Sequence, residues 1–356
     1  MKILHLAAGN RWTGAAAPAF AEVEALRAAG IDAHYAYVGG YKLEAKLRRY
    51  GFAHPVIAKA QNPISFFRTT TALGRLVTLH GFDVVHAHLT YDHWLARFVA
   101  FGRPHLRIAR TFHSRRTLRN EPFTRALLSR TDAVLVTNEE LARAPLLRDR
   151  EVTFTPPPLD TGQFSIDGTN VRSTYGIPDA APVILAIGKM SKDRGFEAVI
   201  ETFARIRAAI PASRLLLIGH GEHRPALETM VASLSLSDAV IWAGYHEDDL
   251  AEHYRSADVL LFTEAGSEEG HRAVLEAMAC GVAPATYPID GMRAILGEWS
   301  ERCIASSSTP DALATIAVNL LRDERLRLRS EVNSRAGLFR YETAANRLID
   351  AYSTVI

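Results

Sequence analysis

Two cations beside a glycine turn are the first residues in this chain whose types and spacing could do chemistry. Lys189 and Arg194 lie five residues apart in a segment that opens at Gly188, directly after an apolar run. Glycine lets the backbone approach a ligand closely, and an ammonium group and a guanidinium fork can both neutralise phosphate. The segment therefore indicates a diphosphate-binding loop. On spacing alone, two solvated surface cations remain the alternative.

Two acidic residues, Glu268 and Glu276, lie eight residues apart, close to two turns of helix. If a helix starts near Gly270, Glu268 lies in the loop at its positive end and Glu276 lies within it. Carboxylates spaced along a cleft accept hydrogen bonds from sugar hydroxyls, and the helix start faces an anion. The alternative is a helix-dipole charge plus an ordinary surface glutamate. The small and apolar residues 277–281 that follow Glu276 argue against this alternative, because Glu276 then lies on an otherwise apolar stretch.

A second glycine turn, around Gly14, follows the first apolar run and precedes a helical stretch. Neither turn has the spacing GxGxxG or GxxxxGK[ST], which disfavours a nicotinamide dehydrogenase and a P-loop kinase. A tight turn without a ligand remains the alternative reading of either loop alone.

Three histidines lie in or directly after expected strands in the first half of the chain. His113 ends a strand at the predicted ligand-binding edge. His86 and His88 alternate along one strand, so we expect them to point to opposite faces of the sheet and to be mainly structural. A metal pair is therefore not expected. The two cysteines, Cys280 and Cys303, do not have the spacing of a zinc site either.

Short apolar runs alternate with helical stretches, a pattern typical of parallel sheets covered by helices on both faces. In the first half, the expected strands are residues 3–7, 33–38, 84–88, 107–111, 133–137 and 152–155, with helices at 16–29 and 63–80. In the second half, they are residues 183–187, 214–218, 240–243, 259–263 and 282–286, with helices at 197–209, 222–234, 248–257 and 272–279. A last amphipathic helix is expected at residues 342–352.

The strand pattern stops at three consecutive prolines, Pro156 to Pro158, and then restarts. The charge changes at the same place. Residues 1–164 hold 22 Lys and Arg against 13 Asp and Glu, a balance of +9, whereas the whole chain carries +2. We expect two doubly wound, Rossmann-like α/β domains, residues 1–164 and 165–338, and a final helix at 339–356. The default ligand site is the cleft between the domains.

Composition narrows the class of protein. With 356 residues, 48% hydrophobic and 22% charged, the chain is neither disordered nor fibrous. Two cysteines fit a reducing cytosol. The first apolar run is too short and too broken for a signal peptide, and no run reaches the roughly 18 residues that span a bilayer. A cytoplasmic protein is expected, and nucleic-acid binding is the weakest candidate.

These segments resemble the family 4 (group 1) retaining glycosyltransferases, which have the GT-B fold. Glu268 to Glu276 is similar to the Glu-x7-Glu motif of that family. The turn from Gly188 to Gly195 is similar to its phosphate clamp, with the two cations exchanged. Similar segments of matching order and spacing are residues 83–88, 111–113, 219–222, 243–245 and 257–261.

The resemblance implies transfer of a sugar from a nucleotide diphosphate sugar, UDP- or GDP-linked, with retained configuration and without a metal or other cofactor. His113, Glu268, Lys189 and Arg194 are the implied catalytic residues, and either Glu268 or Glu269 contacts the sugar. Glu276 is assigned to the ribose. The donor-binding set is Gly14, Gly188, Lys189, Arg194, Gly219, Tyr245, Glu268, Glu269, Gly270, His271, Arg272 and Glu276.

The acceptor is expected to be an anionic saccharide or glycolipid of a cell-envelope glycan. Eight arginines lie between Arg103 and Arg130 with Glu121 as the only acid, and Arg115, Arg116 and Arg119 directly follow His113. Such a stretch favours phosphate or carboxylate and a peripheral contact with the inner face of a membrane. A basic surface that only aids solubility is the alternative. The rival functions are an epimerase or phosphorylase of the same fold, and a non-catalytic sugar-nucleotide binding protein.

Overall fold

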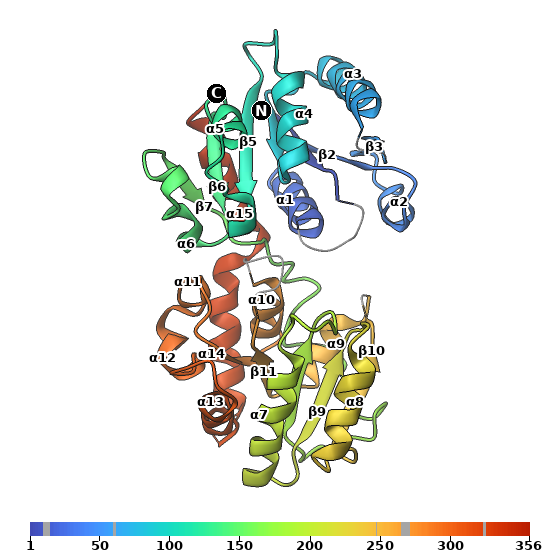
Figure 1. Ribbon diagram of the computed structural model, residues 1–356, viewed down its shortest axis with the longest axis vertical. Coiled ribbons are helices and arrows are strands. Elements are labelled where there is room, and N and C mark those ends of the chain that lie inside the picture. Colours follow the sequence, from blue (N-terminus) through green and yellow to red (C-terminus); the bar gives the residue numbers. More distant parts are fainter. Residues whose placement is uncertain (10–14, 60–61, 247, 265–270, 323–324) are drawn as a thin grey trace. The chain divides into compact units, whose positions relative to one another are not determined.

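The computed structural model describes residues 1–9, 15–59, 62–246, 248–264, 271–322 and 325–356. These residues form two compact α/β units (Figure 1). The first unit contains Met1–Pro158 and Phe339–Ile356, and the second contains the described residues between Leu159 and Leu338. Each unit is built on one parallel sheet flanked by helices, so the predicted fold class of two doubly wound domains is confirmed.

The first unit is built on a seven-stranded parallel sheet in the order β3-β2-β1-β4-β5-β6-β7. The chain extends this sheet in both directions from its middle, so β1 and β4 flank the switch point where ligands bind in such folds. The strands are β1 (Lys2–Ala7), β2 (Asp32–Val38), β3 (Ala53–Ile57), β4 (Val84–Ala87), β5 (Arg107–Phe112), β6 (Ala133–Val136) and β7 (Val152–Phe154).

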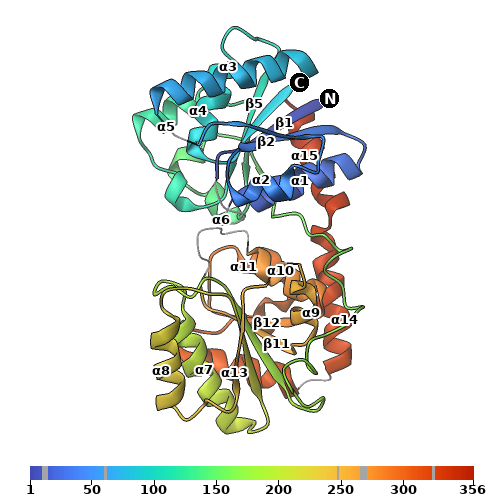
Figure 2. The ribbon, with the colours of Figure 1, turned by 90° about the vertical axis from the view of Figure 1, so that its right-hand side faces the viewer.

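Helices cover both faces of this sheet. One face packs against α1 (Ala16–Ala28) and α15 (Tyr341–Ser353), and the other packs against α3 (Pro63–His80) and α4 (Thr90–Val99). The last helix of the chain therefore completes the first unit, and Figure 2 shows α15 beside α1. The remaining helical segments of the unit are α2 (Lys42–Leu47), η1 (Arg115–Thr117), α5 (Pro122–Leu128), α6 (Glu139–Ala142) and η2 (Pro145–Leu147).

The second unit is built on a five-stranded parallel sheet in the order β10-β9-β8-β11-β12. Its strands are β8 (Val183–Ile187), β9 (Arg214–Ile218), β10 (Val240–Gly244), β11 (Val259–Phe262) and β12 (Ala283–Thr286). Its helical segments are α7 (Phe196–Ala209), α8 (Arg224–Ser233), α9 (Leu250–Arg255), α10 (Arg272–Ala279), α11 (Met292–Leu296), η3 (Gly297–Trp299), α12 (Ser300–Cys303), α13 (Pro310–Arg322) and α14 (Arg325–Ala336). The short η4 (Gly337–Phe339) leads back to the first unit.

Local signals explain why some elements could be predicted to the residue. Helix α3 begins after Asn62, whose side chain accepts a hydrogen bond from the Ser65 amide at 2.9 Å, and it has Pro63 in its first turn. It ends at Gly81, which has a φ of 65°. The predicted range of residues 63–80 is therefore confirmed.

Strand β3 was not predicted from the sequence. It contains Pro55, which cannot donate a ladder hydrogen bond, and a proline argues against a central strand. The structure places β3 at the edge of the sheet, where a proline is tolerated. Pro284 in β12 lies at the edge of the other sheet for the same reason. Among the helices of the described chain, none is both long and apolar enough to cross a bilayer.

A buried histidine makes the first unit sensitive to acid. His93 in α4 shares a 2.8 Å hydrogen bond with the Thr131 hydroxyl, and burial lowers the pKa of His93 to about 3. Below the usual histidine pKa of about 6.5, the unfolded chain takes up a proton that the folded chain does not. Stability is therefore lost as the pH falls from 6.5 towards 3.

We expect His93→Gln to reduce the fall in the free energy of unfolding between pH 7 and pH 5. The single histidine accounts for about 2 kcal/mol between pH 7 and pH 5. Urea unfolding at both pH values measures it, and His105→Gln, at an exposed position, is the control. Equal pH slopes for His93→Gln and the unmodified protein would contradict the prediction.

Candidate functional site

Two glycine turns meet at the carboxyl ends of β8 and β9 in the second unit. The Met190 amide donates to the His220 carbonyl at 2.9 Å, which holds the turns together. A Cβ atom at Gly219 would overlap the Gly188 carbonyl, and one at Gly221 would overlap the Met190 carbonyl. Both positions therefore need glycine because the two backbones lie too close for a side chain.

The two predicted cations flank this pair of turns. Lys189 is half-exposed and donates to Glu222 at 3.1 Å. Arg194 is largely covered, and its Nε lies 3.9 Å from the Asp193 carboxylate without a hydrogen-bond partner in the described part of the chain. The exposed pair of Lys189 with Glu222 contributes little to stability, and Arg194 makes no hydrogen bond to Asp193 through its Nε. Both cations can therefore exchange these carboxylates for a phosphate at little cost.

Tyr245 lies beside the same turns. It follows β10, and the Gly244 carbonyl accepts the amide hydrogen of Gly219 at 2.7 Å. The Tyr245 ring packs edge-on against His220 at 5.3 Å and is 56% exposed. Strands β8, β9 and β10 therefore bring Gly188, Lys189, Gly219 and Tyr245 to one edge of the sheet.

Glu276 is buried in α10 and held by two neighbours. It accepts a hydrogen bond from the Tyr254 hydroxyl at 3.0 Å, and its other oxygen pairs with Arg272 at 2.9 Å. Burial raises the pKa of Glu276, and Arg272 and Tyr254 partly oppose that rise. The carboxylate is thus fixed in one orientation. Tyr254 was missed in the sequence because it lies on α9, and nothing in its spacing relates it to Glu276.

Helix α10 runs over Arg272–Ala279, the range predicted from the sequence. The residue before it, His271, is buried and has a φ of 57°, which is uncommon for a residue other than glycine. Its ring bonds the Asp290 carbonyl at 2.6 Å. The predicted site residues Gly14, Glu268, Glu269 and Gly270 lie outside the described residues.

In the first unit, His113 lies at the end of a chain of histidines. It is 5% exposed, and its Nε2 lies 3.0 Å from Nδ1 of His88, whose Nε2 lies 3.0 Å from Nδ1 of His5. Burial, and then the charge of Arg110, lower the pKa of His113 to about 3, so its ring is neutral. Within the described residues, Nδ1 of His113 is buried without a partner.

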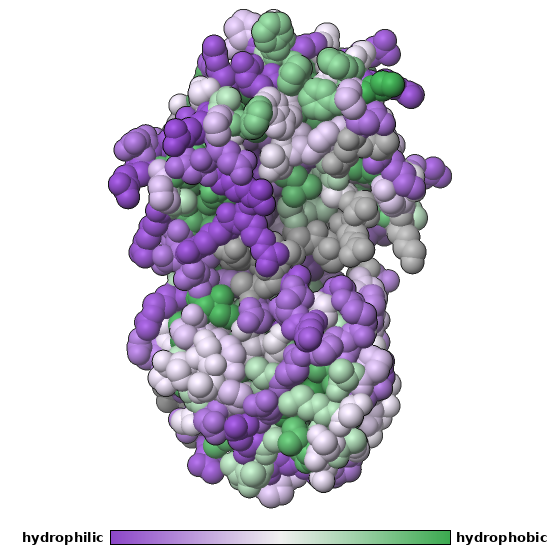
Figure 3. All heavy atoms as spheres, in the orientation of Figure 1, coloured by the Kyte–Doolittle hydropathy of each residue, from purple (hydrophilic) through white to green (hydrophobic). Residues whose placement is uncertain are grey.

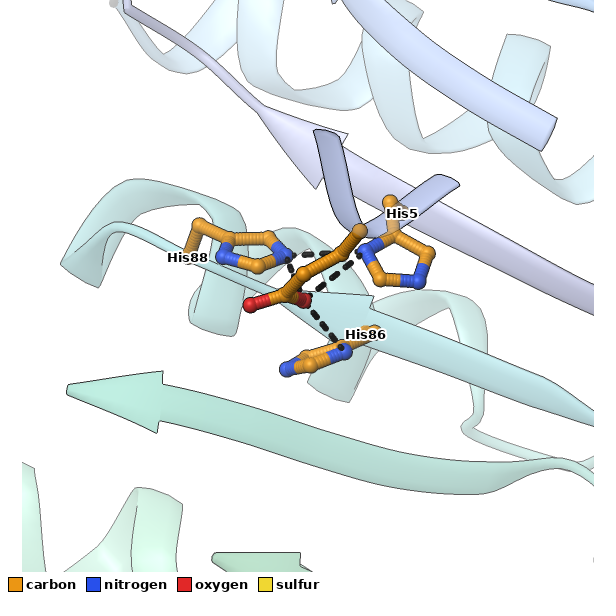
Figure 4. Close-up of side chains that lie close together, drawn as sticks. His5, His86 and His88 are labelled. Carbon is orange, nitrogen blue, oxygen red and sulfur yellow. Dashed lines mark hydrogen bonds and ion pairs between the residues drawn. The ribbon is translucent and has the colours of Figure 1, made fainter. Parts of the chain in front are cut away.

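The expectation that His86 and His88 point to opposite faces is wrong. Figure 4 shows the two rings on the same side of the strand, and their centroids lie 4.4 Å apart. The physical reason is the period of a strand: residues i and i+1 alternate, whereas i and i+2 share a face. The two histidines can therefore enter one site.

Arg110 is also not where the sequence suggested. It was counted in the basic stretch, but it is 1% exposed beside the buried Asp92. Asp92 accepts the amide hydrogens of Ala8 and Leu89, each at 2.8 Å. Burial raises the pKa of Asp92 to about 7 and lowers that of Arg110 to about 10. Neither residue carries a sequence signal that separates it from surface charges.

The predicted acceptor arginines lie on the surface. Arg115 and Arg116 are exposed on η1, which begins after Ser114, and the Ser114 hydroxyl accepts the Arg116 amide hydrogen at 3.2 Å. Arg119 is exposed as well and lies 3.8 Å from Glu121. The arginine loop therefore starts directly at His113.

Comparison with known proteins identifies the family of the chain. Residues 12–161 match the family described as "Glycosyltransferase Family 4", and residues 167–336 match "Glycosyl transferases group 1". The chain is 29% identical over 314 residues to a D-inositol 3-phosphate glycosyltransferase of Stackebrandtia nassauensis, covering 77% of this chain and 69% of that enzyme. It is 26% identical over 194 residues to an N-acetyl-alpha-D-glucosaminyl L-malate synthase of Bacillus anthracis, covering 54% of this chain and 49% of the synthase.

Among solved structures, the chain is similar to the HepE protein of Anabaena in complex with UDP and glucose. The TM-score is 0.79 at 15% identity, and the match covers 99% of this chain and 100% of that one. Two doubly wound domains of this kind make up the GT-B fold, and glycosyltransferase family models match both halves of the chain. Among the proteins with this fold, the chain belongs to the family 4 (group 1) glycosyltransferases.

The close approach of the two glycine turns can be tested. We expect Gly221→Ala to lower the free energy of unfolding by about 1–3 kcal/mol, because an added methyl group in a packed site forces the backbone apart. Chemical denaturation measures the loss. Gly337→Ala is a matched control, since a Cβ atom there meets nothing within 4 Å. Equal destabilisation of the two variants would show that the turns do not need this contact.

Proposed function

We propose that this protein is a retaining glycosyltransferase that moves a sugar from a nucleotide diphosphate sugar to an anionic acceptor. One observation carries the proposal: Lys189 and Arg194 flank two interlocked glycine turns at the carboxyl edge of the second sheet. Family membership supports the type of reaction. The UDP complex of the Anabaena protein supports a nucleotide-linked donor.

The donor contacts follow from the chemistry of the side chains. Lys189 and Arg194 bind the diphosphate, and the buried carboxylate of Glu276 accepts hydrogen bonds from the ribose hydroxyls. Glu268 or Glu269 holds the transferred sugar. His113 contacts the same sugar through its Nδ1, the atom that is buried without a partner among the described residues.

The reaction breaks the bond between the anomeric carbon and the diphosphate oxygen. A new bond forms between that carbon and the acceptor oxygen, whose proton passes to the leaving phosphate. Negative charge grows on the diphosphate during this step, and fixed cations stabilise it. Lys189 and Arg194 supply that charge, so the proposed transfer needs no metal ion at the phosphates.

An anionic acceptor fits the exposed arginines after His113. Arg115, Arg116 and Arg119 present guanidinium forks, which bind phosphate or carboxylate through paired hydrogen bonds. The names of the two relatives point the same way, because inositol 3-phosphate carries a phosphate and malate carries two carboxylates. The acceptor we propose is therefore a phosphorylated or acidic saccharide or glycolipid.

A peripheral membrane contact fits a second surface of the first unit. Phe67 on α3, Phe98 on α4 and Phe123 on α5 are 62%, 47% and 69% exposed, and Trp94 packs against both Phe98 and Phe123. Figure 3 shows apolar side chains gathered on this end of the unit. A groove of about 640 Å³ between α3 and α4 is lined by Arg75 and Arg103, among others. Apolar and cationic side chains together fit the inner, anionic face of a membrane.

A donor screen tests the proposal. We expect either UDP- or GDP-sugars to raise the melting temperature, since ligand binding stabilises the folded state. With an anionic acceptor, the product should keep the anomeric configuration of the donor, which NMR reads directly. Conversion of the donor without any acceptor would indicate an epimerase. If the protein binds the donor but neither transfers the sugar nor slowly hydrolyses the donor, it is a non-catalytic binding protein.

Substitution of Lys189 and Arg194 tests their proposed role in binding the diphosphate. Lys189→Ala and Arg194→Ala should each weaken donor binding and lower kcat/KM, because a charge-assisted hydrogen bond is worth about 1.5–3 kcal/mol. Calorimetry and initial rates measure both effects. Lys192→Ala is the matched control, since Lys192 is exposed on the same loop. Unchanged kinetics in the first two variants would overturn the assignment.

The acceptor arginines and the aromatic surface are predicted to act independently. The triple variant Arg115→Ala/Arg116→Ala/Arg119→Ala should raise KM for an anionic acceptor at low salt and leave donor affinity unchanged. Phe67→Ser/Phe123→Ser should reduce flotation with anionic liposomes and leave a water-soluble acceptor unaffected. For the arginine triple variant, the control is Arg148→Ala/Arg150→Ala, at exposed positions of the same unit. If the control has the effect of the triple variant, the effect reflects net charge and not an acceptor site.

A further inference from the structure

Three histidines and one glutamate meet under the switch point of the first sheet. His5 on β1 is the strand partner of His86 on β4, and His88 follows two residues later on the same face. Glu22 projects from α1, which covers that face. All four side chains are at most 1% exposed. Figure 4 shows the three histidine rings converging from the two strands.

The four side chains converge on one point. Oε2 of Glu22 lies 3.6 Å from Nδ1 of His5, 3.6 Å from Nε2 of His88 and 3.8 Å from Nδ1 of His86. Nδ1 of His5 and Nε2 of His88 are 3.0 Å apart, and all four atoms lie within 4.8 Å of one another. Ligands about 2.0–2.2 Å from a tetrahedral zinc ion are separated from one another by about 3.3–3.6 Å.

Within the described part of the chain, the Glu22 carboxyl group has no hydrogen-bond partner. Neither of its oxygens has a hydrogen bond among the described residues, although both are buried. A protonated carboxyl group would need to donate its hydrogen, and an ionised one would need a positive charge. The histidine nitrogens lie 3.6–3.8 Å from Oε2 of Glu22, too far to satisfy the carboxyl group with a hydrogen bond.

We propose that His5, Glu22, His86 and His88 form a closed, four-coordinate site for a divalent transition metal, with zinc as the best fit. Three imidazole nitrogens and one carboxylate oxygen are ligands of the type that zinc takes. Four protein ligands leave no open position, which is typical of a structural site. The ion would tie α1 to β1 and β4 inside the core.

The outer nitrogens of His86 and His88 already have partners of the kind that a metal site uses. A metal-bound histidine uses its second nitrogen to bond a neighbour, which fixes the ring. Nε2 of His86 bonds the Thr111 hydroxyl at 2.7 Å, and Nδ1 of His88 bonds His113 at 3.0 Å. The Tyr352 hydroxyl lies 2.7 Å from Nδ1 of His86 and 3.4 Å from Nε2 of His5. If Nδ1 of His86 binds the metal, the Tyr352 hydroxyl loses its hydrogen bond to that atom and bonds Nε2 of His5 instead.

The metal also determines which nitrogen of His113 carries a proton. With Nε2 of His88 on the metal, its Nδ1 must be protonated and donates to Nε2 of His113. The neutral His113 ring then carries its proton on Nδ1, which becomes a hydrogen-bond donor. A donor at this atom suits a sugar oxygen. That consequence rests on the function proposed above, whereas the metal site itself does not.

Two other groups of potential ligands are weaker candidates. His34, His54 and His80 are not all buried, and Nδ1 of His34 already bonds His54 at 2.8 Å. In the group of His246, Asp249 and His253, only His253 is buried, and the Asp249 carboxylate already accepts a hydrogen bond from His246 at 2.9 Å. Neither group contains a buried carboxylate without a partner among the described residues.

Metal analysis of the purified full-length chain tests the site. After expression in medium with zinc and removal of any affinity tag, we expect mass spectrometry of the metals to find about one zinc ion per chain. Protein grown with cobalt should show the strong visible bands of tetrahedral cobalt(II). Glu22→Gln and His86→Gln should lose the ion, and His54→Gln, from the partly buried group of His34, His54 and His80, should keep it.

The outcome does not depend on enzyme activity or on a stable variant. If Glu22→Gln fails to fold, the cobalt spectrum and X-ray absorption of the unmodified protein still report the ligand set. Less than about a tenth of an ion per chain, with no visible band after growth in cobalt, overturns the proposal. An ion that survives in both Glu22→Gln and His86→Gln overturns it too. ¹⁵N NMR of the imidazoles should find the His113 proton on Nδ1, and a proton on Nε2 would refute the coupling to His113.

Discussion

Burial of both sheets on both faces is the constraint on which the rest of this structure depends. Parallel strands covered by helices leave water access only at their ends, so polar chemistry is confined to the loops there. In the second unit, those loops must approach one another to form a phosphate site. That approach explains why Gly219 and Gly221 have no room for a side chain beside Gly188 and Met190.

The first unit meets the same constraint in a different way. His5 and His86 lie within its strands, under α1, where an apolar side chain would ordinarily pack. Buried polar groups need partners, and each ring here has at least one. One partner, Tyr352, comes from the last helix of the chain. Segments far apart in sequence therefore complete one polar network in the core of this unit.

Most of the fold could be read from the sequence because periodicity records burial. Strands that are apolar along nearly their whole length, such as β8 and β9, are predicted with their observed bounds. The exception, β3, carries a proline that only its edge position makes possible. Single residues near the site were harder, because Tyr254 and Asp92 act through contacts between elements that no local pattern records. The assignments on Glu268 and Glu269 remain predictions, since these residues lie outside the described chain.

The positions of His86 and His88 show why the two-residue period of a strand matters for recognising the proposed metal site. Two residues apart on a strand means a shared face, and His86 and His88 share theirs with His5 and the carboxylate of Glu22. The same geometry places His88 between the proposed metal and His113. A metal ion there would hold the ring of His88 and, through it, the tautomer of His113. A buried structural ion and a residue proposed to contact the sugar would then be linked by a single hydrogen bond. In that case the loss of the ion would change the chemistry of His113 as well as the stability of the sheet.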